Sequence, residues 1–173
     1  MTSLPRRAAL LLAVVPVLAL SACGTDDGGR ATTTAGASPA LAQAALAKQA
    51  DAVCRRFDAE ADRLTPPAAG EDATALAVAV SAFYGKLAGI ASRQQAALEA
   101  LRADADARAR WDAFLAIHRQ ATDLVQGIAP AMDAGEAKKA EGIVARVSAM
   151  APKVDAAADA LGAGVCGSAS GKR

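Results

Sequence analysis

The chain has 173 residues, with 19 Lys and Arg against 18 Asp and Glu and a formal net charge of +1. This balance argues against a nucleic-acid partner, because it offers neither a basic excess nor a basic tail. Apolar residues make up 53% and aromatic residues only 3%, and because alanine buries little area, we expect one domain with a core that is weak for its size.

The first residues have the pattern of a bacterial export signal. Arg6 and Arg7 supply positive charge, and residues 8 to 20 form an apolar run that is too short to span a bilayer as a helix. The quartet Leu20-Ser21-Ala22-Cys23 resembles the lipobox of bacterial lipoproteins. The resemblance implies that residues 1 to 22 are a cleaved signal peptide and that a diacylglycerol joins the Cys23 thiol. Two acyl chains, palmitate for example, give stable membrane anchoring.

Two alternatives stay open for this segment. One is an ordinary secretory signal, in which Cys23 is incidental. The other concerns the export route, because paired arginines also occur in twin-arginine signals and the sequence does not decide between that route and Sec. Cleavage after residue 22 removes Arg6 and Arg7 and leaves 17 bases against 18 acids.

Four helices are expected after this segment. Residues 23 to 37 are rich in Gly, Thr and Asp without apolar periodicity, which predicts a flexible tether. Ser38-Pro39 is typical of a helix start, and the first helix ends before Pro66 and Pro67. Its apolar face recurs at steps of three and four residues: Leu46, Ala50, Val53, Phe57, Ala61 and Leu64.

The second and third predicted helices are joined near Asp104 and Asp106, either of which can cap the third. The second follows Gly70, with a nearly heptad stripe that favours shallow crossing angles. That stripe comprises Leu76, Val80, Phe83, Leu87, Ile90, Ala97 and Leu101, with Gln94 at its centre. The third helix closes at Pro130 and Asp133-Ala134-Gly135, and its apolar face comprises Phe114, Ile117, Ala121, Leu124, Val125 and Ile128, flanked by Trp111 and Leu115.

The fourth predicted helix carries Ile143, Val147, Met150, Val154, Ala157 and Leu161, and Gly162 and Gly164 end it. Pro152 lies inside it, so we expect a kink or a break there. Nothing in the sequence indicates a strand. The prediction is therefore an all-α, antiparallel four-helix bundle with up-down-up-down topology over residues 38 to 166, followed by a disordered tail over residues 167 to 173.

The two remaining cysteines, Cys54 and Cys166, form an even pair that is expected to be a disulfide outside the cytoplasm. Full alignment of the four helices would place Cys166 near residue 40, roughly 20 Å from Cys54. We therefore expect a stagger, with residues 38 to 50 extending beyond the bundle as an alanine-rich stalk. Burial of Leu41 and Leu46 between other helices would contradict this.

Gln94 and His118, the only histidine, are the most informative polar residues. Both are expected within about one helical turn of each other on adjacent helices. Because a polar group buried alone is costly, they should bond to each other or to water. One interpretation is a polar layer that fixes the register of the bundle. The other is a ligand pocket with Gln94 and His118 as its floor and Trp111 as its wall.

Catalytic and metal sites find little support. A di-iron bundle needs two Glu-x-x-His pairs, whereas Leu115 stands three residues before His118 and no second histidine exists. The carboxylates of the first helix alternate with arginines, which is typical of a solvated, ion-paired face. We therefore expect no catalytic residue, no metal and no cofactor. A hydrolase depending on His118 is a third, weaker hypothesis.

The chain resembles a loose, largely uncharacterised class of small lipoproteins of high-GC Gram-positive bacteria. The likeness rests on LSAC (20–23), the tether, DAVC (51–54), RWDAFLAIHRQ (110–120) and LGAGVC (161–166). It implies a helical domain anchored to the extracytoplasmic face of the cell membrane, and it transfers no active site. The sequence therefore predicts a non-enzymatic lipoprotein of the cell envelope that acts as a protein-interaction or accessory module with an envelope protein. The alternative is a small-molecule carrier or sensor, with a cavity around Gln94, Trp111 and His118.

Overall fold

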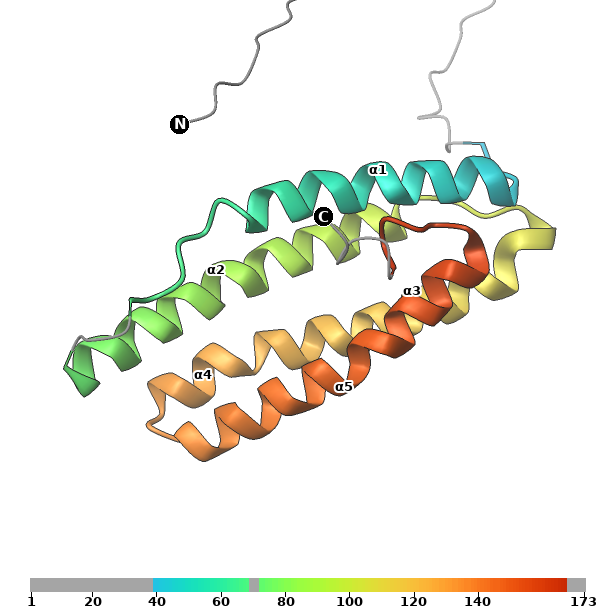
Figure 1. Ribbon diagram of the computed structural model, residues 1–173. Coiled ribbons are helices and arrows are strands. Elements are labelled where there is room, and N and C mark those ends of the chain that lie inside the picture. Colours follow the sequence, from blue (N-terminus) through green and yellow to red (C-terminus); the bar gives the residue numbers. More distant parts are fainter. Residues whose placement is uncertain (1–38, 69–71, 168–173) are drawn as a thin grey trace, which may run out of the picture. The chain divides into compact units, whose positions relative to one another are not determined.

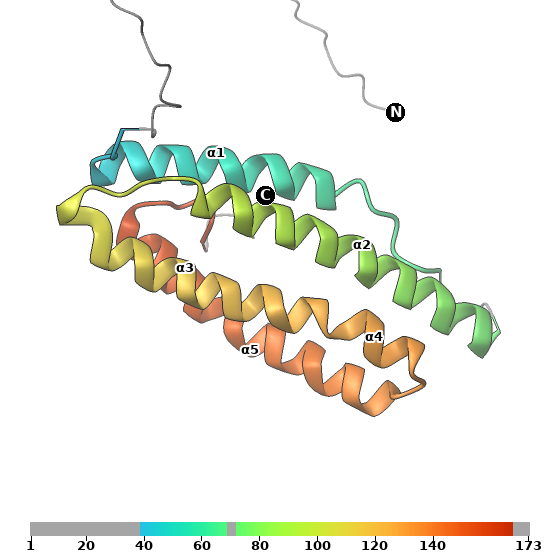
Figure 2. The same ribbon diagram turned by 180° about the vertical axis from the view of Figure 1, so that it is seen from behind.

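The computed structural model describes residues 39–68 and 72–167, and this part of the chain is all-helical (Figure 1). Its helices are α1 (Gln43–Ala61), α2 (Ala73–Glu99), α3 (Ala105–Gln126), α4 (Ile128–Asp133) and α5 (Ala137–Leu161). Because α4 continues α3 after Gly127, the five helices form four antiparallel rods (Figure 2). The predicted all-α four-helix bundle is confirmed. The predicted signal peptide, Cys23 and the predicted tether lie outside the described residues.

Aspartate side chains begin two of the long helices. Asp104 accepts a hydrogen bond from the backbone N–H of Ala107 at 2.9 Å, as expected for the cap of α3. Asp106 lies in the first turn of the same helix, where a negative charge is favourable. Asp72, which the sequence reading did not single out, caps α2 by accepting from the N–H groups of Thr74 and Ala75.

The start of the first helix was predicted at Ser38-Pro39, and this is wrong. α1 begins at Gln43, because Leu41 is extended and pairs with Ala103 in the α2–α3 connection. The N–H of Leu41 donates to the Arg102 carbonyl at 2.7 Å, and the Leu41 carbonyl accepts from the Asp104 N–H at 2.9 Å. These bonds attach the beginning of the domain to its α2–α3 end.

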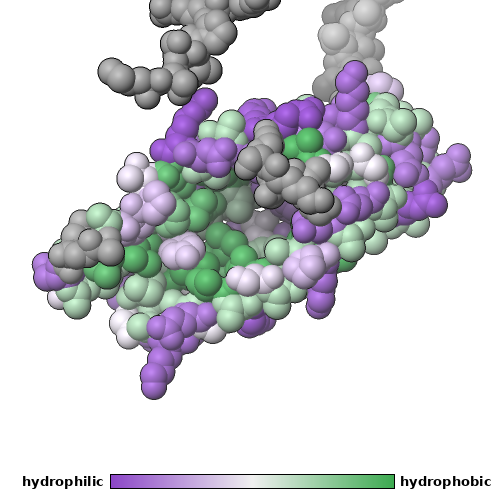
Figure 3. Space-filling view, in the orientation of Figure 1, coloured by the Kyte–Doolittle hydropathy of each residue, from purple (hydrophilic) through white to green (hydrophobic). Residues whose placement is uncertain are grey.

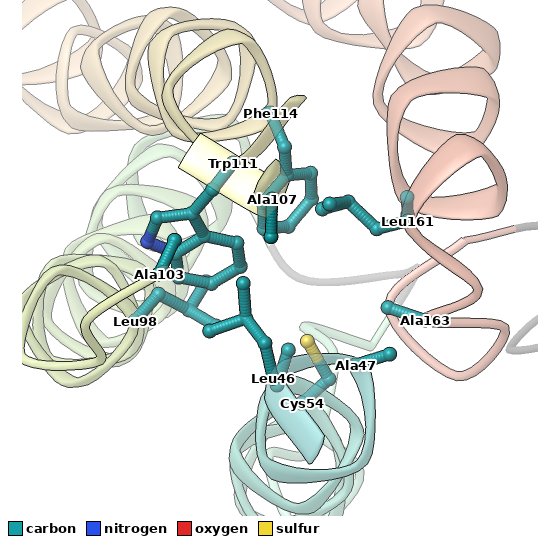
Figure 4. Close-up of a cluster of buried hydrophobic side chains, with 12 residues drawn as sticks. Leu46, Ala47, Cys54, Leu98, Ala103, Ala107, Trp111, Phe114, Leu161 and Ala163 are labelled. Atoms are coloured by element: carbon teal, nitrogen blue, oxygen red, sulfur yellow. The ribbon is translucent and has the colours of Figure 1, made fainter. Parts of the chain in front are cut away.

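The predicted stalk is also wrong, because α1 is part of the core from its first turn. Leu46 is fully buried and packs with Leu98, Trp111 and Leu161 of the other helices (Figure 4). Its neighbours Ala47 and Ala50 are buried as well. The small alanine side chains let α1 approach the bundle closely, and the large ones fill the space between.

The tail after α5 explains how the disulfide forms without a stalk. Gly162, at φ +82°, ends α5 beside Ala47 rather than below residue 40, so Cys54 is only about seven residues, roughly 10 Å, further along α1. The chain then doubles back between α1 and α5 (Figure 1), and Cys54 and Cys166 are joined across 112 residues. Both Val165 and Cys166 donate their N–H groups to Oδ1 of Asp51, at 2.8 and 3.3 Å.

Two further boundaries differ from the sequence prediction. Gly167 was assigned to the disordered tail, but it is buried against α5, where a Cβ would come within 3.1 Å of the Asp155 carbonyl. A kink or a break was expected at Pro152, and α5 runs through this residue without a break. Residues 168–173 lie outside the described part.

By length and composition, α2 is the one described helix that is apolar enough to cross a membrane. In the bundle it packs against α1, α3 and α4.

Candidate functional site

His118 bonds to Gln95 and not to Gln94. Its Nδ1 lies 2.6 Å from Oε1 of Gln95, and Nε2 of Gln95 donates to Glu99 at 2.7 Å. Because Glu99 accepts from the amide NH₂, the amide oxygen faces the ring, so His118 carries its proton on Nδ1. Glu99 is in turn ion-paired with Arg119, which closes a polar link between α2 and α3. Gln94 and His118 were expected to bond to each other or to water; the partner of His118 is instead Gln95, the next residue in the sequence.

His118, the buried end of the polar link, is uncharged at neutral pH. Burial lowers the pKa of His118 to about 4, although the negative charge of Glu99 acts in the opposite direction. The hydrogen bond from Arg119 lowers the pKa of Glu99. His118 also packs its ring against Phe114, with 5.7 Å between centroids. This surrounding is that of a register-fixing contact between two helices.

The structure does not bring Gln94, Trp111 and His118 together around one of the described hollows: Gln94 lines a hollow that Trp111 and His118 do not line. Trp111 is buried in the core against Phe114, with 5.4 Å between ring centroids, and its Nε1 has no hydrogen-bond partner in the described part of the chain. Gln94 points elsewhere, because one helical position turns a side chain by about 100°. The face of α2 with Gln95 meets α3, and the face with Gln94 meets a groove.

That groove is an apolar hollow between α1 and α2 on one side and α4 and α5 on the other, visible as the sunken hydrophobic area of Figure 3. It has a volume of about 260 Å³. Apart from the hydroxyl of Tyr84, polar groups lie on its lining only at Asp58, Gln94 and Ser148, among residues that the structure describes. The remaining lining residues are Phe57, Ala61, Tyr84, Leu87, Ile90, Ala91, Val125, Ile128, Val144 and Val147.

The hollow continues toward the α4–α5 turn. A second space of about 440 Å³ shares Tyr84, Ile128 and Val144 with the first, so the two spaces are adjacent. Its other lining residues are Val80, Met132, Ala137, Ala140, Glu141 and Ala145. We call the two spaces together the apolar groove. Asp58 and Glu141 are its only charged lining residues within the described chain.

Two side-chain contacts stand next to groove residues in the sequence. Ser81 of α2, which follows the lining residue Val80, is buried and hydrogen-bonds to Asp133 at the end of α4. Arg93 of α2, which precedes the lining residue Gln94, forms an exposed ion pair with Glu60 of α1. In the described residues, no group of three or more His, Cys, Asp or Glu side chains is placed to hold a metal ion. The arrangement can therefore bind apolar surface, and it presents no cluster suited to metal chemistry.

No protein-family model, no curated protein and no solved structure matches this chain. The described part defines a class by its architecture alone: a four-helix bundle with a cysteine pair that ties the last helix to the first, and with an open apolar groove.

Proposed function

We propose that the protein is a non-enzymatic lipoprotein of the cell envelope that acts as a protein-interaction module. A diacylglycerol on Cys23 holds it at the extracytoplasmic face of the membrane, and the apolar groove receives a segment of an envelope protein. The observation that carries this proposal is the groove itself, because an open apolar groove can receive the apolar face of a segment from another protein.

The shape of the groove favours a protein segment over a small molecule. Small-molecule sites are concave pockets that bury 70–90% or more of their ligand, roughly speaking. The apolar groove instead runs open along one side of the domain and extends past the end of α1. The alternative, a carrier or sensor, depended on a cavity shared by Gln94, Trp111 and His118, but Gln94 lines the groove whereas Trp111 and His118 both pack against Phe114.

The tether supports an interaction close to the membrane. Residues 23 to 37 lack apolar periodicity, and a flexible chain of that length has an end-to-end distance of about 20 Å. A domain held at this distance samples partners that are themselves embedded in or attached to the membrane.

Site-specific photo-crosslinking in the native envelope tests the proposal. A photoreactive residue at Ala145, which is exposed and lines the groove, should give one discrete product with another protein. The matched control is Ala156, which is exposed on the same helix outside the groove and should give none. Equal products from both positions, or none from Ala145, would contradict the interaction module.

Anchoring is tested separately. Cys23→Ser should release the exported protein from the membrane fraction, and mass spectrometry of the wild-type N-terminus should find a diacylated cysteine. An unmodified, freely secreted wild-type protein would contradict the lipid anchor.

A further inference from the structure

In the described part of the chain, α1 is shorter than the other rods of the bundle and leaves one side of the bundle open beyond its end. α1 ends at Ala61, which lines the groove together with Tyr84 of α2. From Tyr84 back to its first residue, Ala73, α2 continues for about three turns, roughly 17 Å, with no part of α1 beside it. In this part of the bundle, α2, α4 and α5 form three rods of a four-rod arrangement.

The described part of the connection between α1 and α2, residues 62 to 68, does not fill the missing position. Leu64 and Pro67 of the described part of that connection lie against Ala79 and Phe83, on another face of α2. The face that carries Val80 and Tyr84 lines the groove instead. The open side of the groove therefore coincides with the place that a longer first helix would occupy.

The other half of the same gap shows that an added segment fits there. Between α1 and α5, the gap near the disulfide is occupied by the chain's own tail, residues 162 to 167 (Figure 1). Asp51 holds this tail through the N–H groups of Val165 and Cys166. The tail brings Ala163 into the core, where it is fully buried.

The charges of the lining select the kind of segment. The two charged side chains of the groove, Asp58 and Glu141, are both acidic, and no Lys or Arg is found among its described lining residues. They lie on α1 and α5, on opposite sides of the apolar floor made by Tyr84, Ile128 and Val144. An occupant that matches this pattern has an apolar face with basic side chains along its edges.

We propose that the groove binds a basic amphipathic helix of about three turns from the partner protein, which completes the bundle in trans. This inference rests on the proposed function and names the chemistry of the partner. The apolar stripe of the helix packs on Tyr84, Ile128 and Val144, and its basic side chains meet the exposed carboxylate of Glu141. It is a helix-in-groove interaction with acidic groups as the selective element.

Binding of defined peptides tests this inference. The full chain carrying Cys23→Ser, oxidised at Cys54 and Cys166, is titrated against three fluorescent peptides of 15 residues. The first has Leu at helical spacings of three and four and Lys elsewhere, the second has the same composition scrambled, and the third has Glu in place of Lys. Fluorescence anisotropy should show the first binding at least ten-fold more tightly than the other two. Equal binding of the basic and acidic peptides would overturn the inference.

Two pairs of variants locate the bound peptide. Ala145→Trp fills the groove and should weaken binding at least ten-fold, whereas Ala156→Trp, outside it, should not. Glu141→Lys should weaken binding of the basic peptide about five-fold, whereas Asp112→Lys, exposed on α3, should not. Circular dichroism confirms that each variant is folded. Unchanged binding in Ala145→Trp and Glu141→Lys would place the peptide elsewhere and overturn the inference.

The crosslinking and peptide-binding experiments together distinguish a failure of this inference from a failure of the proposed function. A specific crosslink at Ala145 together with a failed peptide panel overturns only the basic helix and leaves the interaction module standing. If sedimentation instead shows a dimer that Ala145→Trp dissociates, the occupant is a second copy and the inference is wrong. Loss of the crosslink at Ala145 overturns the proposed function itself.

Discussion

The Nδ1 atom of His118 lies 2.6 Å from the amide oxygen of Gln95, and this contact sets the register between α2 and α3. Gln95 is buried, and its amide group continues the link to Glu99 and Arg119 at the surface. Because the histidine is enclosed and neutral, the contact depends on pH, whereas the apolar contacts around Phe114 do not. The dependence can be measured.

Acidification should destabilise the domain through His118. Its pKa of about 4 in the folded state lies below the ordinary value of 6.5, because burial disfavours the charged form. As pH falls, the unfolded chain therefore takes up the proton first, so stability is complete above pH 6.5 and declines toward pH 4. The loss reaches at most about 3 kcal/mol. Denaturant unfolding at pH 7, 5.5 and 4.5, followed by the emission of Trp111, measures it.

The control for this prediction is His118→Asn, which keeps an N–H donor for Gln95 but does not titrate. The variant should lose less stability than the wild type between pH 6.5 and 4.5. Because the pKa of Glu99 is held below its ordinary 4.5, the contribution of that carboxylate is lost only at lower pH. Parallel stability curves for wild type and variant would show that His118 is not the titrating group.

Reduction of the cysteine pair should weaken the domain considerably. The bond between Cys54 and Cys166 closes a loop of 112 residues, and chain entropy sets an upper limit of about 4.7 kcal/mol for a loop of that order. Urea unfolding with and without a reductant measures the loss. The double variant Cys54→Ser, Cys166→Ser should have the same free energy of unfolding as the reduced wild type, and the reductant should not change it. An unchanged midpoint on reduction would contradict the prediction.

Periodicity and capping residues predicted most of the fold. The apolar repeats predicted the positions of the four rods. Asp104 predicted the start of α3, because an aspartate side chain before a helix accepts a hydrogen bond from a backbone N–H group of the first turn. The even pair of cysteines predicted the link between Cys54 and Cys166 without any knowledge of the path. These features are local or depend on counting, so they can be read from the chain alone.

The groove and the partner of His118 could not be predicted in the same way. Gln94 and Gln95 are adjacent, and which one meets α3 depends on a rotation of α2 that only the packing of all four rods sets. The groove arises because α1, with 19 residues, is shorter than α2, with 27 residues. That difference became informative only once the position of Ala61 beside Tyr84 was known.

Leu46→Ala should destabilise the domain by about 2 to 5 kcal/mol, because it removes a fully buried side chain and leaves a cavity. The control is Val78→Ala on α2, where the side chain is 66% exposed and a change within about 0.5 kcal/mol is expected. Urea unfolding measures both. Equally small losses of stability in the two variants would mean that Leu46 is not part of the core, and would support the predicted stalk over residues 38 to 50.

Asp51 should stabilise the tail that carries Cys166. Its Oδ1 accepts the N–H groups of Val165 and Cys166, and hydrogen bonds to a charged acceptor contribute about 1.5 to 3 kcal/mol. Asp51→Ala should therefore lower the free energy of unfolding by about this amount and speed reduction of the disulfide by dithiothreitol.

The variant Asp51→Asn keeps an oxygen acceptor at the same place and should recover part of both losses. In the background Cys54→Ser, Cys166→Ser, the effect of Asp51→Ala should be smaller, because the tail is then held by fewer interactions and leaves α1 more readily. Unfolding curves and thiol release measured on the same samples give both quantities. If Asn loses as much as Ala, the bonds to Oδ1 do not hold the tail, and the disulfide alone closes the gap between α1 and α5.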